Sequence, residues 1–217
     1  MKTVWVICEG PTEEQFIKTV ISPDIPNIAI KPLLLGKGGD VRFERVENQA
    51  KLLLSNGHDL VTTFIDLYGL GTGFPEQAAA HAVADVYERL TLLENACDVK
   101  ITAQARCQAE RFFCYIQPHE FEALLFASPG KIVELEQTWH TTGTKLHKIL
   151  ADFNGNPELI NDHVTTAPSK RLMAALPGYQ KTTHGPRAAK KIGLNKLETT
   201  CKHFRGWLHK LRTISSP

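Results

Sequence analysis

Short apolar runs alternate along this chain with stretches in which apolar residues have helical spacing. Residues 3–8 are almost entirely apolar, as expected for a strand that is buried on both faces of a parallel sheet. Further strands are predicted at 28–35, 60–65 and 111–117. Helical spacing follows them at 12–21, 41–53, 77–93 and 121–125. This alternation is typical of an α/β sheet whose parallel strands are joined by right-handed crossovers.

Local signals set the expected bounds of these elements. Thr12 and Gln15 have the spacing of a capping box, which predicts that the first helix begins there. Pro32 lies within the second predicted strand and favours an edge position for it. Asp40 follows a glycine-rich turn and is predicted to cap the second helix.

The predicted fold class is therefore α/β, with four mainly parallel strands flanked by helices. We expect this sheet to occupy residues 1–128. Residues 129–217 contain short helical stretches and turns without a clear strand pattern. They predict a helical, basic C-terminal extension that packs on the first part.

Composition narrows the class of protein. The chain has 217 residues, of which 42% are hydrophobic and 22% are charged, and these values exclude a disordered chain, a collagen-like repeat and a disulfide scaffold. Five cysteines without a C-x-x-C pair predict reduced thiols in an intracellular, cytoplasmic protein. The apolar run before Glu9 is too short for a signal peptide or a membrane span, so no membrane partner is expected.

The formal net charge of +2 hides an uneven distribution. Residues 1–167 hold 14 Lys and Arg against 22 Asp and Glu, whereas residues 168–217 hold 11 against one. Clustered cations attract a polyanion such as nucleic acid and release its counterions. The alternative is that this basic quarter, residues 168–217, packs on the acidic part and neutralises it.

Acidic residues follow three of the predicted strands. Glu9 comes directly after the first strand and Asp66 after the third, which places both at the carboxyl edge where ligands bind in α/β sheets. Carboxylates there are suitable ligands for Mg²⁺ or Mn²⁺. Glu120 and Glu122 follow the fourth strand, but on a helix their side chains would diverge by roughly 200°. We therefore expect only one to point inward, with Glu120 favoured; the alternative for each acid is simple helix capping.

Four motifs resemble a known family. They are Cys8-Glu9-Gly10-Pro11-Thr12-Glu13, Thr63-Phe64-Ile65-Asp66-Leu67-Tyr68-Gly69-Leu70, Gln117-Pro118-His119-Glu120-Phe121-Glu122-Ala123-Leu124 and Ala167-Pro168-Ser169-Lys170-Arg171. Together they resemble a TOPRIM-like family of unknown function (domain of unknown function 4276), related to the TOPRIM domains of topoisomerases, primases and OLD-type nucleases. The resemblance implies a TOPRIM/Rossmann-like fold. Because members are typically bacterial and often encoded beside an ATPase, it also implies an ATPase partner and a role in phage defence or a mobile element.

The resemblance further implies phosphodiester hydrolysis that depends on Mg²⁺ or Mn²⁺, with Glu9 as general acid/base or ligand and Asp66 on the metal. The second acid of the TOPRIM Asp-x-Asp pair is replaced by Tyr68, which can bind phosphate but is a poor Mg²⁺ ligand. The metal site must then recruit Glu120, Glu122 or Glu13, or hold one ion weakly, or be degenerate.

The basic quarter offers groups for phosphate. Lys170, Arg171 and Lys181, together with Tyr68, are candidate phosphate-binding residues, and Lys181 is also a candidate to stabilise charge on a scissile phosphate. The first functional hypothesis is a metal-dependent nuclease acting on nucleic acid. A non-catalytic nucleic-acid-binding or regulatory subunit and a nucleotide phosphohydrolase are the alternatives, and a homo-oligomer is left open.

Overall fold

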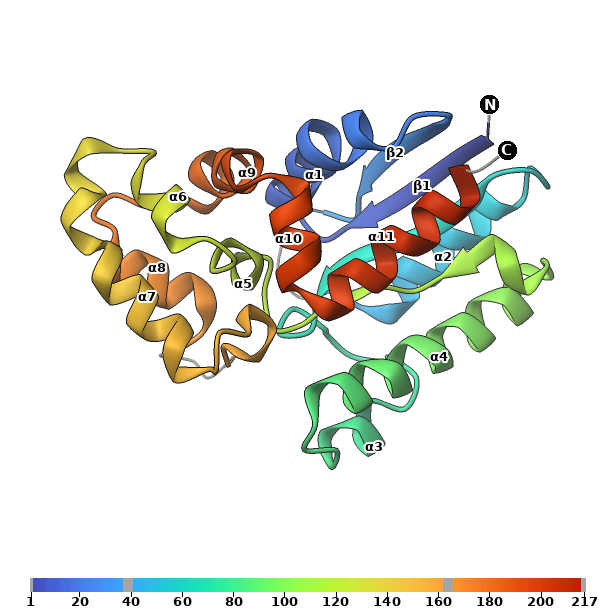
Figure 1. Cartoon of the computed structure of the whole chain (residues 1–217). Helices are drawn as coiled ribbons and strands as arrows, with labels where there is room; N and C mark the ends of the chain where they lie inside the picture. Colours follow the sequence, from blue (N-terminus) through green and yellow to red (C-terminus); the bar gives the residue numbers. More distant parts are fainter. Residues whose placement is uncertain (1, 37–40, 162–165, 216–217) are drawn as a thin grey trace.

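The protein is described here from a computed structural model, which covers residues 2–36, 41–161 and 166–215. Its sheet has the order β2 (Ile28–Leu34), β1 (Lys2–Cys8), β3 (Leu60–Asp66) and β4 (Phe112–Phe113), and β5 (Ile116–Gln117) also pairs with β3. All of these pairings are parallel (Figure 1). The predicted α/β fold is confirmed, and β2 lies at an edge as Pro32 indicated.

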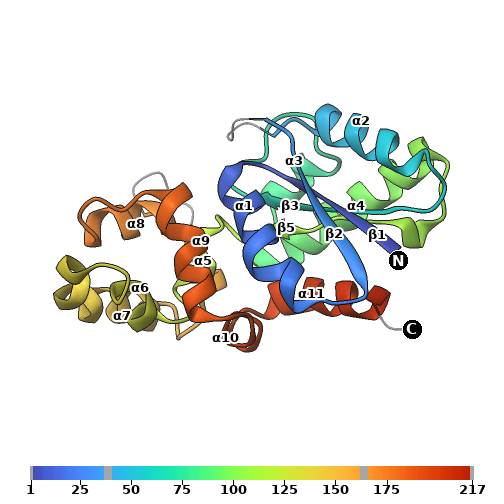
Figure 2. The same cartoon turned by 90° about the horizontal axis from the view of Figure 1, so that it is seen from above.

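Helices cover both faces of the sheet, because alternate residues of the buried strands point to opposite sides. Ile7 belongs to an apolar cluster with α2 (Phe43–Leu54) and α4 (Val86–Ala105). Val6 belongs to a second cluster with α1 (Pro11–Phe16) and α11 (Lys202–Ser215). Figure 2 shows α2 and α11 on opposite sides of the strands.

The remaining helices lie mostly at one end of the sheet. They are α5 (Glu122–Leu125), α6 (Pro129–Val133), α7 (Gly143–Asp152), α8 (Pro168–Ala175), α9 (Lys181–Ile192) and α10 (Leu194–Thr200), with α3 (Gln77–His81) near the start of α4. Figure 1 shows α6, α7 and α8 farthest from the strands. One apolar cluster contains residues from both sides of position 128, and the division predicted there stays a prediction. Among the described residues, no helix is long and apolar enough to cross a membrane.

Two of the expected helix starts differ from the structure. The first helix begins at Pro11 with Gly10 as its N-cap, and the Glu13 carboxylate accepts from the Gly10 N–H at 2.9 Å. The predicted Thr12–Gln15 capping box is therefore wrong. The helix α2 begins at Phe43, and the predicted cap Asp40 lies outside the described residues.

The helix predicted over 77–93 is interrupted. It ends at His81 and restarts at Val86, where the Asp85 carboxylate accepts hydrogen bonds from the backbone N–H groups of the next turn at 2.9 Å. An aspartate that satisfies two otherwise unpaired N–H groups makes a strong helix start. The apolar periodicity on both sides of this break gave no sign of it.

The single strand predicted over 111–117 is also wrong, because β4 and β5 are separate. Between them the Thr63 hydroxyl accepts from the Tyr115 N–H and contacts the Tyr115 carbonyl oxygen, each at 2.8 Å. A side chain thus replaces the backbone ladder where the strand is interrupted.

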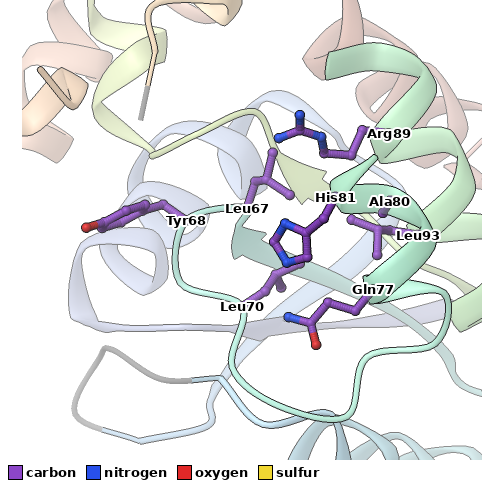
Figure 3. A pocket seen from close by; sticks show the side chains of 8 residues that line it. All are labelled: Leu67, Tyr68, Leu70, Gln77, Ala80, His81, Arg89 and Leu93. Atoms are coloured by element: carbon purple, nitrogen blue, oxygen red, sulfur yellow. The ribbon is translucent and has the colours of Figure 1, made fainter. Parts of the chain in front are cut away.

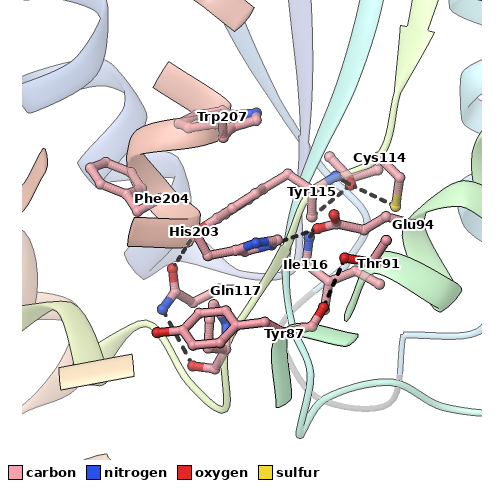
Figure 4. Close-up of polar contacts among 12 residues, drawn as sticks. Tyr87, Thr91, Glu94, Cys114, Tyr115, Ile116, Gln117, His203, Phe204 and Trp207 are labelled. Atoms are coloured by element: carbon pink, nitrogen blue, oxygen red, sulfur yellow. Dashed lines mark hydrogen bonds and ion pairs between the residues drawn. The ribbon is translucent and has the colours of Figure 1, made fainter. Parts of the chain in front are cut away.

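Two carboxylates of α4 hold the same interrupted strand from the other side. Asp98 accepts from the Cys114 N–H at 2.6 Å, and Glu94 accepts from the Ile116 N–H at 2.8 Å. Glu94 also contacts Nε2 of His203, on α11, at 2.8 Å (Figure 4). Helices from opposite faces of the sheet are therefore joined through the strand that leads to the candidate site.

Replacing His203 by Gln should remove a pH-dependent stabilisation. Burial lowers the pKa of His203, but its bond to Glu94 and the charge of Glu94 outweigh burial and raise the pKa above its ordinary 6.5. The stabilisation, roughly 1.5–3 kcal/mol for a bond to a charged group, is complete below pH 6.5. It is lost as pH rises through the folded-state pKa.

Urea denaturation of the wild type and His203→Gln at about pH 5.5 and about pH 9 measures this difference. His209→Gln is the matched control, since His209 is exposed on the same helix, and it should change stability by less than about 0.5 kcal/mol. An equal loss in His203→Gln at both pH values would contradict the role of the ion pair.

Candidate functional site

Glu9 and Asp66 meet at the carboxyl edge of adjacent strands, as predicted. The Asp66 N–H donates to Oε2 of Glu9 at 3.2 Å. The chain then turns back over Glu9, with the Gly69 N–H bonded to the Asp66 carbonyl at 3.1 Å. A Cβ at Gly69 would lie 2.7 Å from Cδ of Glu9, so only glycine permits this close approach of backbone and carboxylate.

Glu120 and Glu122 both reach the same cation, contrary to the expectation that only one would point inward. Lys181 Nζ lies 3.4 Å from Oε1 of Glu120 and 3.5 Å from Oε2 of Glu122. The helix α5 begins only at Glu122, and His119 has a left-handed φ of 62°. Because Glu120 precedes the helix, the angular separation of helical side chains does not apply to this pair.

A backbone N–H group also fixes the position of Glu120. Its Oε2 accepts from the Ser169 N–H at 2.9 Å, at the start of α8. Ser169 itself is buried. The Glu120 carboxylate thus joins the sheet edge to the basic quarter. The sequence gave no sign of this contact, because its partners are 49 residues apart.

Glu13 completes the group of acids, and we call Glu9, Glu13, Asp66, Glu120 and Glu122 the carboxylate cluster. Burial, with the charges of Glu9 and Glu122, raises the pKa of Glu13 to about 8. The capping bond to Gly10 holds Glu13 in place. The motifs indicated Glu13 only as an alternative metal ligand, although its position three residues after Gly10 is typical of a carboxylate that caps a helix.

Two further acids of the carboxylate cluster, Asp66 and Glu122, have raised pKa values. Burial raises the pKa of Asp66 well above its ordinary value, and the charges of Glu9 and Glu13 add to the effect. Burial also raises the pKa of Glu122 to about 7, against the opposing charge of Lys181. Metal-free protein therefore retains protons in the cluster near neutral pH.

Lys181 is the cation that contacts this cluster. Burial lowers its pKa, but the charges of Glu122, Glu120 and Asp66 outweigh burial and raise it. The ammonium group therefore stays charged. Among the described residues, Lys181 forms ion pairs with two of the five acids, Glu120 and Glu122.

Two oxygens of the carboxylate cluster have unmet hydrogen-bonding capacity. Oδ1 of Asp66 and Oε1 of Glu122 are buried, and no described residue donates to them. Buried polar atoms normally have a partner, which is a protein group, a water molecule or an ion. Carboxylate oxygens of this kind suit Mg²⁺ or Mn²⁺, although no three His, Cys, Asp or Glu side chains of the described ranges form a ready-made metal site.

The predicted phosphate-binding residues lie in different surroundings. Tyr68 is 49% exposed beside the cluster, and its N–H donates to the His119 carbonyl at 3.0 Å. Lys170 is exposed on α8. The guanidinium of Arg171 donates to the Thr166 carbonyl at 2.6 Å and lies over the ring of Phe153, so its contacts lie away from the carboxylate cluster.

Part of the basic quarter does neutralise acids. Lys191 pairs with Glu134 at 3.2 Å, and Arg212 pairs with Asp24 at 3.4 Å. These pairs are partly exposed, and such pairs contribute at most about 1 kcal/mol each. The contacts support the neutralising interpretation for these cations, whereas Lys181 serves the carboxylate cluster.

The comparisons with known proteins identify one family. Residues 8–212 match the model of a family described as a domain of unknown function (DUF4276). No curated protein and no solved structure matches the chain.

Glu13→Gln should reduce the pH dependence of stability in metal-free protein. The pKa of Glu13 rises from 4.5 in the unfolded chain to about 8, so its contribution is full below pH 4.5 and is lost as pH rises through about 8. The slope for one group is at most about 1.4 kcal/mol per pH unit. Gln retains an acceptor for the Gly10 N–H but carries no titrating proton.

Urea denaturation between about pH 5 and about pH 8 should show a flatter decline for Glu13→Gln than for the wild type. Glu14→Gln is the control, since Glu14 is paired with Lys18 at the surface, and its decline should parallel that of the wild type. A parallel decline for Glu13→Gln would show that this side chain is ionised in the folded protein.

Gly69→Ala should displace the Glu9 carboxylate. Because the displaced atoms are the end of a flexible side chain, the free energy of unfolding in urea should fall by no more than roughly 0.5–1.5 kcal/mol, the contribution of the bond to the Asp66 N–H. Gly206→Ala is the control, because nothing lies within 4 Å of its Cβ position on α11, and it should gain up to about 1 kcal/mol from helix propensity. A Glu9 carboxylate that occupies the same position in crystals of Gly69→Ala and the wild type would refute the close approach.

Proposed function

The chain belongs to the DUF4276 family, and we propose that it is a nuclease that hydrolyses phosphodiester bonds with Mg²⁺ or Mn²⁺ at the carboxylate cluster. The observation that carries the proposal is the pair of buried oxygens without a donor, Oδ1 of Asp66 and Oε1 of Glu122. Both belong to a group of five acidic side chains, in which Lys181 is paired with Glu120 and Glu122. A divalent cation would satisfy both oxygens and add positive charge among these acids.

In this proposal Asp66 and Glu122 hold the metal ion, with Glu9 and Glu120 as the further candidate ligands. A bound ion of this kind polarises a phosphoryl oxygen and lowers the pKa of water. The position of Glu9 is fixed by the Asp66 N–H, and that of Glu120 by the Ser169 N–H. Two of the candidate ligands are therefore oriented by backbone groups, and side chains must move to bring three ligands onto one ion.

Two other groups have chemistry that suits the reaction. The ammonium group of Lys181, held by Glu120 and Glu122, is placed to stabilise negative charge on a scissile phosphate. The carboxylate form of Glu13, whose pKa is about 8, is suited to accept a proton from water as the water oxygen attacks phosphorus and the P–O bond to the leaving group breaks. The leaving oxygen then takes a proton from solvent.

The resemblance to TOPRIM proteins supports nucleic acid as the substrate and, further, a role in phage defence or a mobile element beside an ATPase partner. One observation favours a second candidate function. Tyr68 stands where TOPRIM enzymes have a second metal-binding Asp, and it is half exposed. A non-catalytic nucleic-acid-binding or regulatory subunit on a degenerate TOPRIM scaffold would bind nucleic acid without cleaving it.

Asp66→Asn tests the proposal. Adding Mn²⁺ at about 100 times its dissociation constant should stabilise the wild type by about 2.7 kcal/mol, which raises the melting temperature by roughly 5–10 °C. Asp66→Asn should lose most of this response and all cleavage of labelled single-stranded and duplex oligonucleotides. Asp152→Asn, at an exposed residue of α7, should keep both.

Each outcome has a separate meaning. A metal response and cleavage that are both lost in Asp66→Asn support the nuclease. A metal response without cleavage of DNA or RNA supports the non-catalytic subunit. A wild type that Mn²⁺ does not stabilise contradicts the nuclease, and the non-catalytic subunit then takes its place.

A further inference from the structure

A pocket of about 310 Å³ opens beside the carboxylate cluster, between the chain that follows β3 and the helices α3 and α4. Its walls are largely apolar and include Leu67, Leu70 and Leu93. The imidazole of His81 lies among these side chains, with Arg89 and Gln77 on opposite sides of it (Figure 3). No role in metal binding uses these groups.

The pocket and the carboxylate cluster share one short segment of backbone. Asp66 contributes its carboxyl group to the cluster, and Gly69 lies against Glu9. Leu67 and Leu70, from the same segment, line the pocket. The bond from the Tyr68 N–H to the His119 carbonyl ties this segment to the chain that carries Glu120. A ligand in the pocket would therefore contact the same segment, residues 67–70, that lies over Glu9.

The polar groups of the pocket suit a planar, hydrogen-bonding ligand. The Gln77 amide nitrogen donates to the Gly71 carbonyl at 2.9 Å, which orients the amide; the amide oxygen is an acceptor with no donor among the described residues. Two guanidinium nitrogens of Arg89 donate to the Val83 carbonyl at 3.1 and 2.8 Å, so the guanidinium is fixed beside the pocket. Apolar walls with a few oriented polar groups are typical of ligand sites of 300 Å³ or more.

We propose that this pocket binds a nucleobase, and that the base belongs to the nucleotide next to the phosphodiester bond that the carboxylate cluster would cleave. A nucleobase presents flat faces to the leucines and the His81 ring and hydrogen-bonding edges to Gln77 and Arg89. The assignment of the base to a substrate rests on the proposed nuclease function. The binding of a nucleobase does not, because it needs neither metal nor phosphate.

The test uses ¹⁵N-labelled protein with a chelator present. Adenosine, guanosine, cytidine and uridine are titrated separately, and amide chemical shifts are recorded. At least one nucleoside should shift the amides of 67–70 and 77–81 in a saturable manner. His81→Ala should weaken that binding roughly fivefold or more, the lower range for loss of an aromatic stacking partner.

His81 is exposed at the end of α3, so this variant should fold. Gln77→Ala provides a second variant and should also weaken binding. His58→Ala is the control, because His58 is exposed in the turn before β3, at the opposite edge of the sheet, and binding should be unchanged.

The proposal is overturned if no nucleoside produces saturable shifts, or if the shifts map elsewhere, or if they persist unchanged in both His81→Ala and Gln77→Ala. This result is independent of the metal measurements. A protein that binds nucleosides but does not respond to Mn²⁺ has the pocket without the proposed metal chemistry. A protein that responds to Mn²⁺ but binds no nucleoside contradicts the proposed nucleobase pocket and leaves the proposed metal site standing.

Discussion

Crowding of negative charge at one edge of the sheet is the constraint on which this structure depends. Glu9 and Asp66 are brought together because adjacent parallel strands end side by side, and Glu120 and Glu122 join them through the loop after β5. Burying several like charges is costly unless protons or cations compensate them. Among the described residues, Lys181 supplies positive charge to Glu120 and Glu122, and retained protons or a metal ion would compensate further acids.

The surrounding fold holds these repelling groups in place with backbone donors and cross-sheet contacts. N–H groups from three separate segments bind acids of the carboxylate cluster. The interrupted strand that leads to Glu120 is itself held by hydrogen bonds to Thr63, Glu94 and Asp98. Glu94 also contacts His203, on the helix α11 of the opposite face (Figure 4). The site is thus supported by both layers of helices, and the proposed nucleobase pocket is formed where one of these layers meets the sheet edge.

The sequence predicted those parts of the site that depend on strand periodicity alone. Glu9 and Asp66 could be placed at one edge because buried strands have a simple apolar pattern. The convergence of Glu120 and Glu122 could not be predicted, since it depends on the left-handed backbone of His119, for which a sequence of apolar and polar positions gives no signal. The two short strands and the interrupted helix escaped prediction for a related reason: side chains distant in sequence, or a single capping aspartate, replace the regular hydrogen bonds.

The most direct test of a cation site in the carboxylate cluster is anomalous X-ray scattering from a crystal soaked in Mn²⁺. The account predicts an anomalous peak within bonding distance of Asp66 and Glu122, the residues whose buried oxygens have no donor among the described residues. A crystal of Asp66→Asn soaked in the same way should show a weaker peak or none. Manganese bound elsewhere, with no peak between these two carboxylates in the wild type, would contradict the account.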